Sequence, residues 1–581
     1  MSDDVEIDDG GSTTVHRHVD EPVGGPSAAA PVRAAAGPVQ RLGFLRYTLP
    51  GSWTALIFAC LSFTPSLLPR SGIIQGLVCG ITAAIGYGLG VWGASIWRAF
   101  ADRDPRPPRP WAWRAFVVGG GLLLVISFAL GQYWQHEIRA LMGVTSVNVV
   151  LVVLSPLVAA AVFVLLVQIG RGARALYRWL ARQLRRWIGP RAANAVGWIA
   201  VAALTYLVVS GVLLEGIVNA ANETFSLRDT TTAEGVHPPS TDLRSGGPGS
   251  LIPWDTLGWQ GRTFTGVGPS ASDIEKLTHR AAKEPIRAYA GLASADDSAA
   301  RADLVVRDLE HAGGFQRKNL LVVTTTGSGW VNAASADTFE YLSGGDSAIV
   351  AMQYSYLPSW LSYLVDQSKA REAGRDLFDA VYDRWSKLPQ DSRPRLFVGG
   401  ESLGSFGGET AFSGEYDLRN RTSGAVFAGP PNFNTLFTDF REHRDPGTPE
   451  IQPVYRNGRT VRFTNDALTA FPPVGQPWNP PRVLYLMHAS DPIVWWSPRL
   501  VLNRPDWINE SGRDVLQGVF WVPFVTFWQV TADLTFAAGV PDGHGHTYKA
   551  EYVDAWNAVL EPEGVTPDQL AALRAMVTAY T

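Results

Sequence analysis

Cysteine is almost absent from this sequence. The only two, Cys60 and Cys79, both lie in apolar N-terminal stretches, so the last 500 residues contain none. A CxxC metal site, a disulfide framework and a cysteine nucleophile are therefore excluded from the C-terminal part of the chain. A cysteine-free domain is compatible with an oxidising compartment outside the cytoplasm.

An excess of basic charge is also lacking. The chain has 49 Lys and Arg residues against 53 Asp and Glu residues, a formal net charge of −4, and a pI near 6.2. Nucleic-acid-binding domains are usually basic, so we expect no nucleic-acid partner.

Charged residues are nearly missing from five apolar stretches, which lie at residues 50–68, 72–95, 115–134, 147–169 and 194–217. A helix needs about 20 apolar residues to cross the hydrocarbon core of a membrane. We therefore predict about five transmembrane helices, of which the first is the weakest because Pro65 shortens it. The near absence of ionisable residues inside them argues against a transporter.

These stretches define the predicted domains. We expect a disordered cytoplasmic tail at 1–46, a transmembrane helical domain at 47–219, a juxtamembrane linker with some packed aromatic anchors at 220–285, and a catalytic domain at 286–581.

Arginines predict the orientation. They gather between residues 98 and 114 and between 171 and 191, whereas the other two connections contain only Arg70 and Arg139. Positive loops stay in the cytoplasm, so five crossings place everything after residue 220 outside the plasma membrane. That inference fails if only four helices cross. The run RGARALYRWLARQLRRW is either such a topology determinant or a lipid-binding amphipathic helix.

Apolar strands alternate with helices from residue 286 onward. The predicted strands lie at 286–292, 319–327, 347–355, 394–400, 423–429 and 481–490. Continuous apolar strands separated by helices are typical of a mainly parallel sheet with helices on both faces. Ligands of such sheets bind at the carboxyl ends of the strands.

The segment FVGGESLGSFGGE (397–409) contains Gly-x-Ser-x-Gly at 400–404. It is either a flexible loop or a strand that turns sharply into a helix and presents Ser402 as a nucleophile, and the predicted strand before it favours the second. Glycines are needed in that strained turn, and the backbone N–H of Leu403 would then point at the developing oxyanion. Gly407 and Gly408 would let the helix lie close to the sheet.

A serine nucleophile needs a base and an orienting acid. In the α/β-hydrolase order, the acid and then the histidine follow the serine. Asp491 comes directly after a predicted strand and is the candidate acid; the alternative is an aspartate that only opens a turn before Pro492. Only His544 and His546 lie downstream. We predict His546 as the base because it is closer to the following helix, with His544 as the alternative, and interpret His488 as structural.

The second oxyanion donor is expected in TTTGSGWVN, after the strand that ends near Thr326. Ser328 and Gly329 are the candidates for this backbone N–H, and an ordinary glycine turn is the alternative. The apolar insert 515–540 is either part of the core or a lid that touches the membrane.

Several of these segments together resemble a known family. GESLGS, TTTGSGW, QYSYLPSW, HASDPIVWW and GHGHTY look like the actinobacterial membrane-anchored α/β-hydrolase family, which has a multi-helix N-terminal domain. The resemblance covers about residues 45–575. It implies an α/β-hydrolase fold and a serine nucleophile at Ser402.

The expected function is a membrane-anchored serine hydrolase, esterase- or lipase-like, that cleaves an acyl ester outside the cytoplasmic membrane. Ser402, His546 and Asp491 would carry the reaction without a metal or organic cofactor, on a lipid or small acyl-ester substrate. An acyltransferase acting on envelope lipids or glycans with the same triad is the first alternative. A non-catalytic membrane scaffold with a degenerate hydrolase domain is the second. The sequence identifies no protein partner.

Overall fold

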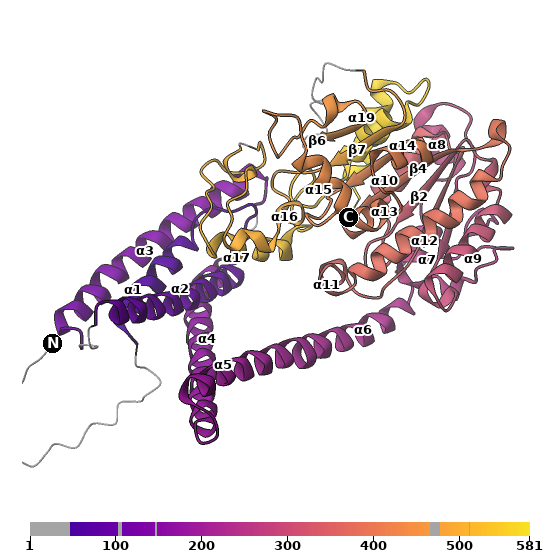
Figure 1. Cartoon of the computed structure of the whole chain (residues 1–581). Helices are drawn as coiled ribbons and strands as arrows, with labels where there is room; N and C mark the ends of the chain where they lie inside the picture. The colour runs from indigo at the N-terminus through magenta and orange to yellow at the C-terminus, as the bar shows by residue number, and fades with distance from the viewer. Residues whose placement is uncertain (1–46, 103–106, 146–147, 465–476, 511, 581) are drawn as a thin grey trace, which may run out of the picture. The chain divides into compact units, whose positions relative to one another are not determined.

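The computed structural model of the chain describes residues 47–102, 107–145, 148–464, 477–510 and 512–580. The tail predicted at 1–46 lies outside these residues. Figure 1 shows the N-terminal helices in indigo and violet, followed by the sheet and its helices in magenta to yellow.

Apolar helices form the N-terminal part: α1 (Leu49–Leu61), α2 (Gly72–Phe100), α3 (Pro110–Leu141), α4 (Val149–Leu184), and a continuous rod of α5 (Pro190–Leu207), η2 (Val208–Leu214) and α6 (Glu215–Asp229). Within the described residues, α2, α3, α4 and the rod are long and apolar enough to cross a membrane. Exposed Val, Leu and Ile side chains cover much of α3 and α4, as lipid-facing helices require.

The first predicted span differs from the expectation. Helix α1 has 13 residues and is about 20 Å long, whereas the hydrocarbon core is about 30 Å thick. Pro65 disfavours a helical conformation at Thr64, so the helix ends early. Five apolar helices are present, but only four of those described have the length of a span.

Residues 220–285, predicted as a linker, are more ordered and more buried than a linker requires. They include the short helices η3 (Trp254–Thr256), α7 (Gly258–Gly266) and α8 (Ala271–Thr278). Ile252 and Leu257 are buried in the same hydrophobic cluster as the sheet. The backbone of Arg244 forms an isolated parallel β-bridge with Arg287 on the edge strand β1.

The sheet has seven strands, all paired in parallel: β1 (Ile286–Ala290), β2 (Asn319–Thr324), β3 (Ser347–Met352), β4 (Arg395–Glu401), β5 (Gly424–Ala428), β6 (Val461–Thr464) and β7 (Arg482–Leu486). Their order is β1-β3-β2-β4-β5-β7-β6, which puts β4 at the centre. Six of these strands were predicted. The four-residue β6 was missed because a strand so short shows no clear apolar run.

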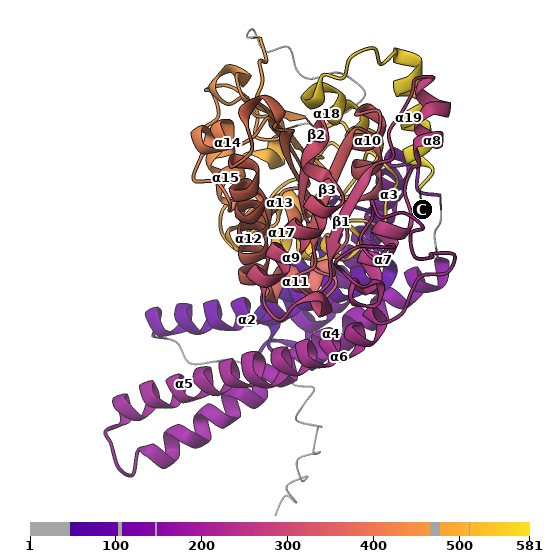
Figure 2. The same ribbon diagram turned by 90° about the vertical axis from the view of Figure 1, so that its right-hand side faces the viewer.

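Helices cover both faces of this sheet, as the predicted α/β architecture requires (Figure 2). On one side lie α9 (Ser298–His311), α12 (Gln367–Ser386) and α13 (Leu403–Glu409), and on the other α7, α10 (Ala333–Leu342), α18 (Ala550–Leu560) and α19 (Pro567–Thr578). The remaining helices are α11 (Ser359–Val365), α14 (Glu415–Arg421), α15 (Thr435–Glu442), α16 (Pro492–Trp495) and α17 (Val525–Asp533), with the short turns η4 (Leu292–Ser294), η5 (Gly314–Gln316), η6 (Gln390–Ser392), η7 (Arg456–Gly458), η8 (Pro498–Val501), η9 (Trp507–Asn509) and η10 (Leu534–Phe536).

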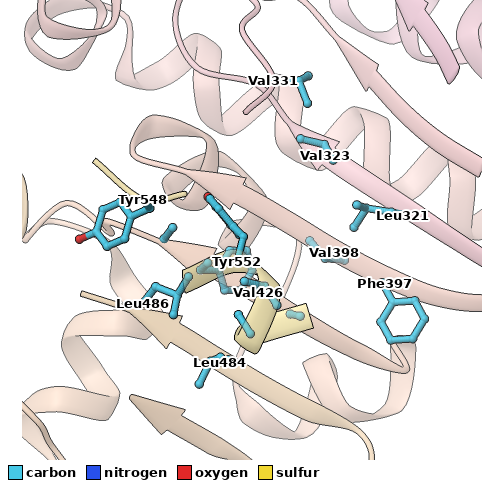
Figure 3. Packing of buried hydrophobic residues seen from close by; sticks show 14 of the residues in the cluster. Leu321, Val323, Val331, Phe397, Val398, Val426, Leu484, Leu486, Tyr548 and Tyr552 are labelled. Atoms are coloured by element: carbon cyan, nitrogen blue, oxygen red, sulfur yellow. The ribbon is translucent and has the colours of Figure 1, made fainter. Parts of the chain in front are cut away.

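The core is continuous across the central strands. Figure 3 shows Leu321, Val398, Val426 and Leu484 on four neighbouring strands, with Tyr552 of α18 packed beside them. Burying each such aliphatic side chain contributes roughly 1.5–3 kcal/mol to stability. The core therefore holds the carboxyl ends of β4, β5 and β7 in fixed positions.

The insert 515–540 is mainly an interface between the N-terminal helices and the sheet domain. Its helix α17 packs against α2, and Val525 and Val530 are buried. The Gln529 side-chain amide donates to the carbonyl oxygen of Thr64 at 2.9 Å.

Candidate active site

Ser402 lies in a strained turn between β4 and α13. Its φ of 55° and ψ of −124° fall outside the regions that side-chain-bearing residues favour. Added Cβ atoms at Gly400 and Gly404 would lie 2.4 Å from the carbonyl carbon of Gly404 and 2.2 Å from the carbonyl oxygen of Thr324. The structure thus forms the strand–turn–helix, not the flexible loop, and both motif glycines are sterically required.

Asp491 and His546 lie in direct contact. Asp491 caps α16 after β7, and its Oδ1 accepts a hydrogen bond from the Ile493 N–H at 2.8 Å. Its Oδ2 lies 2.7 Å from Nδ1 of His546. The Asp491 carboxylate is fully buried, so it orients the imidazole in a site without competing water.

Ser402 and His546 both lie beside the end of β5, but no hydrogen bond joins the Ser402 hydroxyl to His546 among the described residues. The Ser402 N–H donates to the carbonyl oxygen of Ala428 at 2.9 Å, and the His546 ring would clash with any side chain on the next residue, Gly429. The Nε2 atom of His546 is buried and has no hydrogen-bond partner in the described part of the chain. This nitrogen is therefore the one left to exchange a proton with a substrate or a nucleophile.

The electrostatic environment favours a basic His546. Burial opposes the charged imidazolium, but the charge of Asp491, its hydrogen bond and the charge of Glu401 outweigh this, and the pKa of His546 is raised above its ordinary 6.5.

Tyr548 is a site residue that the sequence interpretation missed. Its hydroxyl donates to Oδ2 of Asp491 at 2.8 Å, and its ring stacks on His488 at 4.2 Å. The final Tyr of GHGHTY was the available signal, but a tyrosine two residues after a histidine has no meaning until the fold brings it to the acid.

His488, which we interpreted as structural, contacts the loop that carries His546. Its Nδ1 lies 2.8 Å from the carbonyl oxygen of Gly545, and its Nε2 lies 3.5 Å from Glu551. Burial opposes its charge, yet Glu551, Asp514 and the Gly545 carbonyl raise the pKa of His488 to about 9. A buried cation thus supports the loop that carries His546.

Glu401, the residue before Ser402, was also missed. Its Oε2 accepts hydrogen bonds from Asn332 at 2.6 Å and from the Tyr552 hydroxyl at 2.8 Å. Burial raises the pKa of Glu401, although His546, Tyr552 and Asn332 act in the opposite direction. It is a second carboxylate that acts electrostatically on His546.

His544 lies apart from this contact. It is half-buried and forms an isolated bridge with Thr547, and burial lowers its pKa. No hydrogen bond or ion pair between His544 and Asp491 occurs in the described structure. The geometry therefore favours His546 over His544 as the base.

The backbone N–H groups predicted as oxyanion donors lie at the start of α13 and in the loop after β2. Leu403 is the first residue of α13, so its N–H has no acceptor within the helix. In the loop after β2, the Gly329 N–H donates to Thr326 at 2.9 Å, whereas no described hydrogen bond uses the Ser328 N–H. The Ser328 carbonyl is held by Gln353 at 3.2 Å. Of the two predicted candidates, Ser328 is thus the one whose backbone N–H has no described hydrogen-bond acceptor.

The arrangement suits nucleophilic acyl chemistry. It combines a serine in a strained turn, a buried Asp–His pair and free backbone donors. No group of three or more His, Cys, Asp and Glu residues that could hold a metal ion occurs among the residues with described positions.

Comparison with known proteins gives two matches. Residues 286–573 match the model described as "Alpha/beta-hydrolase family", and residues 63–269 match the one described as "Alpha/beta-hydrolase family N-terminus". No curated protein and no solved structure matches the chain.

Proposed function

Because the chain belongs to this α/β-hydrolase family, we propose that it is a membrane-anchored serine hydrolase that cleaves an acyl ester. Family membership supports a hydrolase-type function. The observation that carries the finer proposal is the 2.7 Å contact of His546 with Asp491 at the strand ends that also hold the strained Ser402.

Each group has a defined part in the proposed reaction. Ser402 Oγ attacks the acyl carbonyl and passes its proton to Nε2 of His546, while Asp491 orients the imidazolium. The N–H groups of Leu403 and Ser328 bind the oxyanion. His546 then protonates the leaving alcohol, and water releases the acyl group by the same route.

Aromatic side chains favour an apolar acyl group. Four aromatic rings form a row of contacts. The ring centroids lie 4.9 Å apart for Phe406 and Phe433, 4.8 Å for Phe433 and Tyr363, and 5.8 Å for Tyr363 and Trp496. Trp496 also contacts Phe527 of α17 at 5.9 Å. Because α17 packs on α2, apolar contacts connect the neighbourhood of Ser402 with the N-terminal helices, which supports a lipid substrate.

We also propose that the sheet domain lies on the extracytoplasmic side of the plasma membrane. The connection after α1 contributes Leu67 and Leu68 to the core of the sheet domain, and the end of α3 contributes Ile138 and Met142. These are the arginine-poor connections. The arginine-rich ones therefore lie at the opposite ends of the helices, on the side that the positive-inside rule assigns to the cytoplasm.

This orientation does not depend on α1. If α2, α3, α4 and α5 each cross once, the positive-inside rule applied to the arginine-rich connections predicts that the end of α5 is outside, whether or not α1 spans. The proposed orientation of the sheet domain therefore does not require five transmembrane helices, although from the sequence alone we expected it to require them.

Product analysis tests the proposed reaction. The purified full-length chain in detergent should convert p-nitrophenyl esters to nitrophenol and free carboxylic acid, faster for longer acyl chains. Transfer of the acyl group to an added alcohol in preference to water would identify an acyltransferase. If neither the free acid nor the transfer product forms, the hydrolase and the acyltransferase proposals are both contradicted, and a non-catalytic scaffold is supported.

A further inference from the structure

The connection between α1 and α2 is bound to the end of α17. Oδ2 of Asp533 accepts hydrogen bonds from the Ser66 hydroxyl at 2.6 Å and from the Leu67 N–H at 3.2 Å. Its Oδ1 accepts one from Nε of Arg70 at 2.8 Å. The Arg70 and Asp533 side chains are only 1% and 0% exposed. This ion pair joins residues 463 positions apart in the sequence.

The same connection is also fixed to α3. The Arg70 N–H donates to Gln135 at 2.8 Å, and the Arg70 carbonyl accepts from Arg139 at 2.9 Å. Arg70 is thus held by α3 on one side and by α17 on the other. The connection behaves as a rigid bridge and not as a solvated loop.

The loop that carries His546 contacts both the connection between α1 and α2 and the segment that follows Asp533. Asp533 is followed by η10 and then by Ala537, whose carbonyl accepts the His546 N–H at 2.7 Å. Leu68 also contacts the loop directly, because its Cδ2 lies 3.3 Å from where a Cβ on Gly545 would be. Gly545 immediately precedes His546, so two routes lead from the connection to the histidine.

We propose that Arg70 and Asp533 are positioning residues, through which the N-terminal helical domain holds His546 against Asp491. The helical domain is then a functional part of the active site as well as an anchor. The inference rests on the proposed function, since it takes His546 to be the base.

The charge of the pair decides the choice of variant. Removing one partner of a buried ion pair leaves an uncompensated charge and is strongly destabilising, whereas replacing both with apolar residues is often neutral. The double variant Arg70→Met/Asp533→Leu therefore removes the ion pair and its hydrogen bonds with the smallest expected loss of folding stability.

The test is the pH dependence of fluorophosphonate labelling of the full-length chain in detergent. The charged groups around His546 are Asp491, Glu401 and His488. A displaced imidazole loses the stabilising carboxylate while remaining buried. The double variant should label about 10- to 100-fold more slowly at the optimum, and its acidic midpoint should move to lower pH.

A matched control separates positioning from stability. Arg287 of β1 forms an equally buried ion-pair cluster with Asp337 and Glu340 of α10, with side chains 3%, 9% and 0% exposed. Arg287→Met/Asp337→Asn/Glu340→Leu removes the cation and the charge of both partners, and it should alter the melting temperature but leave the wild-type pH profile. An unchanged profile in the Arg70/Asp533 variant would overturn the proposal.

A milder variant tests the proposal if the Arg70→Met/Asp533→Leu chain does not fold. Ser66→Ala removes one hydrogen bond to Asp533 and should give the same shift of the acidic midpoint, only smaller. Ser66→Ala with a wild-type profile would again overturn the proposal. A wild-type chain that the probe does not label would refute the proposed function itself.

Discussion

Nδ1 of His546 lies 2.7 Å from Oδ2 of Asp491, although 55 residues separate them in the sequence. The contact leaves Nε2 of His546 as the free nitrogen, and it connects the ends of two segments that the core holds in place. The proposals on catalysis all depend on this relationship.

The first expectation concerns the base. His546→Ala should lower kcat by about 10⁴- to 10⁶-fold, because loss of a triad histidine removes general-base catalysis. His544→Ala is the matched control and should lower kcat only slightly. The reverse ranking in ester hydrolysis would assign the role to His544, and equally small effects would reject both.

The second concerns the hydroxyl of Tyr548. Tyr548→Phe keeps the ring on His488 but removes the hydrogen bond that the hydroxyl donates to Asp491 and the one that it accepts from the His488 N–H. The charge of Asp491 then acts more strongly on His546. The raised pKa of His546 should rise further. The acidic limb of kcat/KM should therefore shift to higher pH than in the wild type, with a loss of about tenfold or less in rate.

A control comes from Tyr580, whose hydroxyl donates to Asp337 at 2.7 Å, away from the site. Tyr580→Phe should keep the wild-type profile. A limb that stays in place or moves to lower pH in Tyr548→Phe would contradict the proposed role of its hydroxyl.

The third concerns stability and pH. The pKa of His488 is about 9 in the folded chain against an ordinary 6.5. The folded state therefore binds the extra proton, and this stabilisation is complete below pH 6.5 and is lost as the pH rises through 9. The loss is on the order of 3 kcal/mol, so the melting temperature should fall over this range.

His488→Gln should flatten that dependence, and His443→Gln, at an exposed histidine, should not. Melting curves of the three chains in detergent between pH 6 and 9.5 provide the comparison. If the melting temperature of His488→Gln fell by as much as that of the wild type, a group other than His488 would be responsible, and the prediction would be contradicted.

The fourth concerns topology. In a background with Cys60→Ala and Cys79→Ala, Ser240→Cys should react with a membrane-impermeant maleimide in intact cells. Gln183→Cys, at the arginine-rich end of α4, should react only after permeabilisation. Both positions are exposed. The opposite pattern would place the sheet domain in the cytoplasm.

Local features of the structure could be predicted from the sequence. The turn at Ser402 is encoded within five residues, and the buried strands are long apolar runs. The shortened α1 was foreseen in part, since Pro65 marks where the helix must stop. The four-residue β6 offers too little pattern to be recognised.

Features that depend on distant contacts could not be predicted. Tyr548 matters only because its hydroxyl reaches Asp491, and Glu401 only because the fold buries it beside His546. The choice between His544 and His546 rested on position in the sequence, whereas the structure separates them by contact with the acid. Nothing in the sequence pairs Arg70 with Asp533.

The central claim is that Ser402 is an activated nucleophile, and labelling with a fluorophosphonate probe tests it most directly. The wild-type chain should be labelled, and Ser402→Ala should not, while Ser413→Ala, at an exposed serine, should label like the wild type. Ser402→Ala should keep the wild-type melting temperature, because it removes one oxygen and no described hydrogen bond of the hydroxyl. Labelling of Ser402→Ala at the wild-type rate, or no labelling of a folded wild-type chain, would contradict the account.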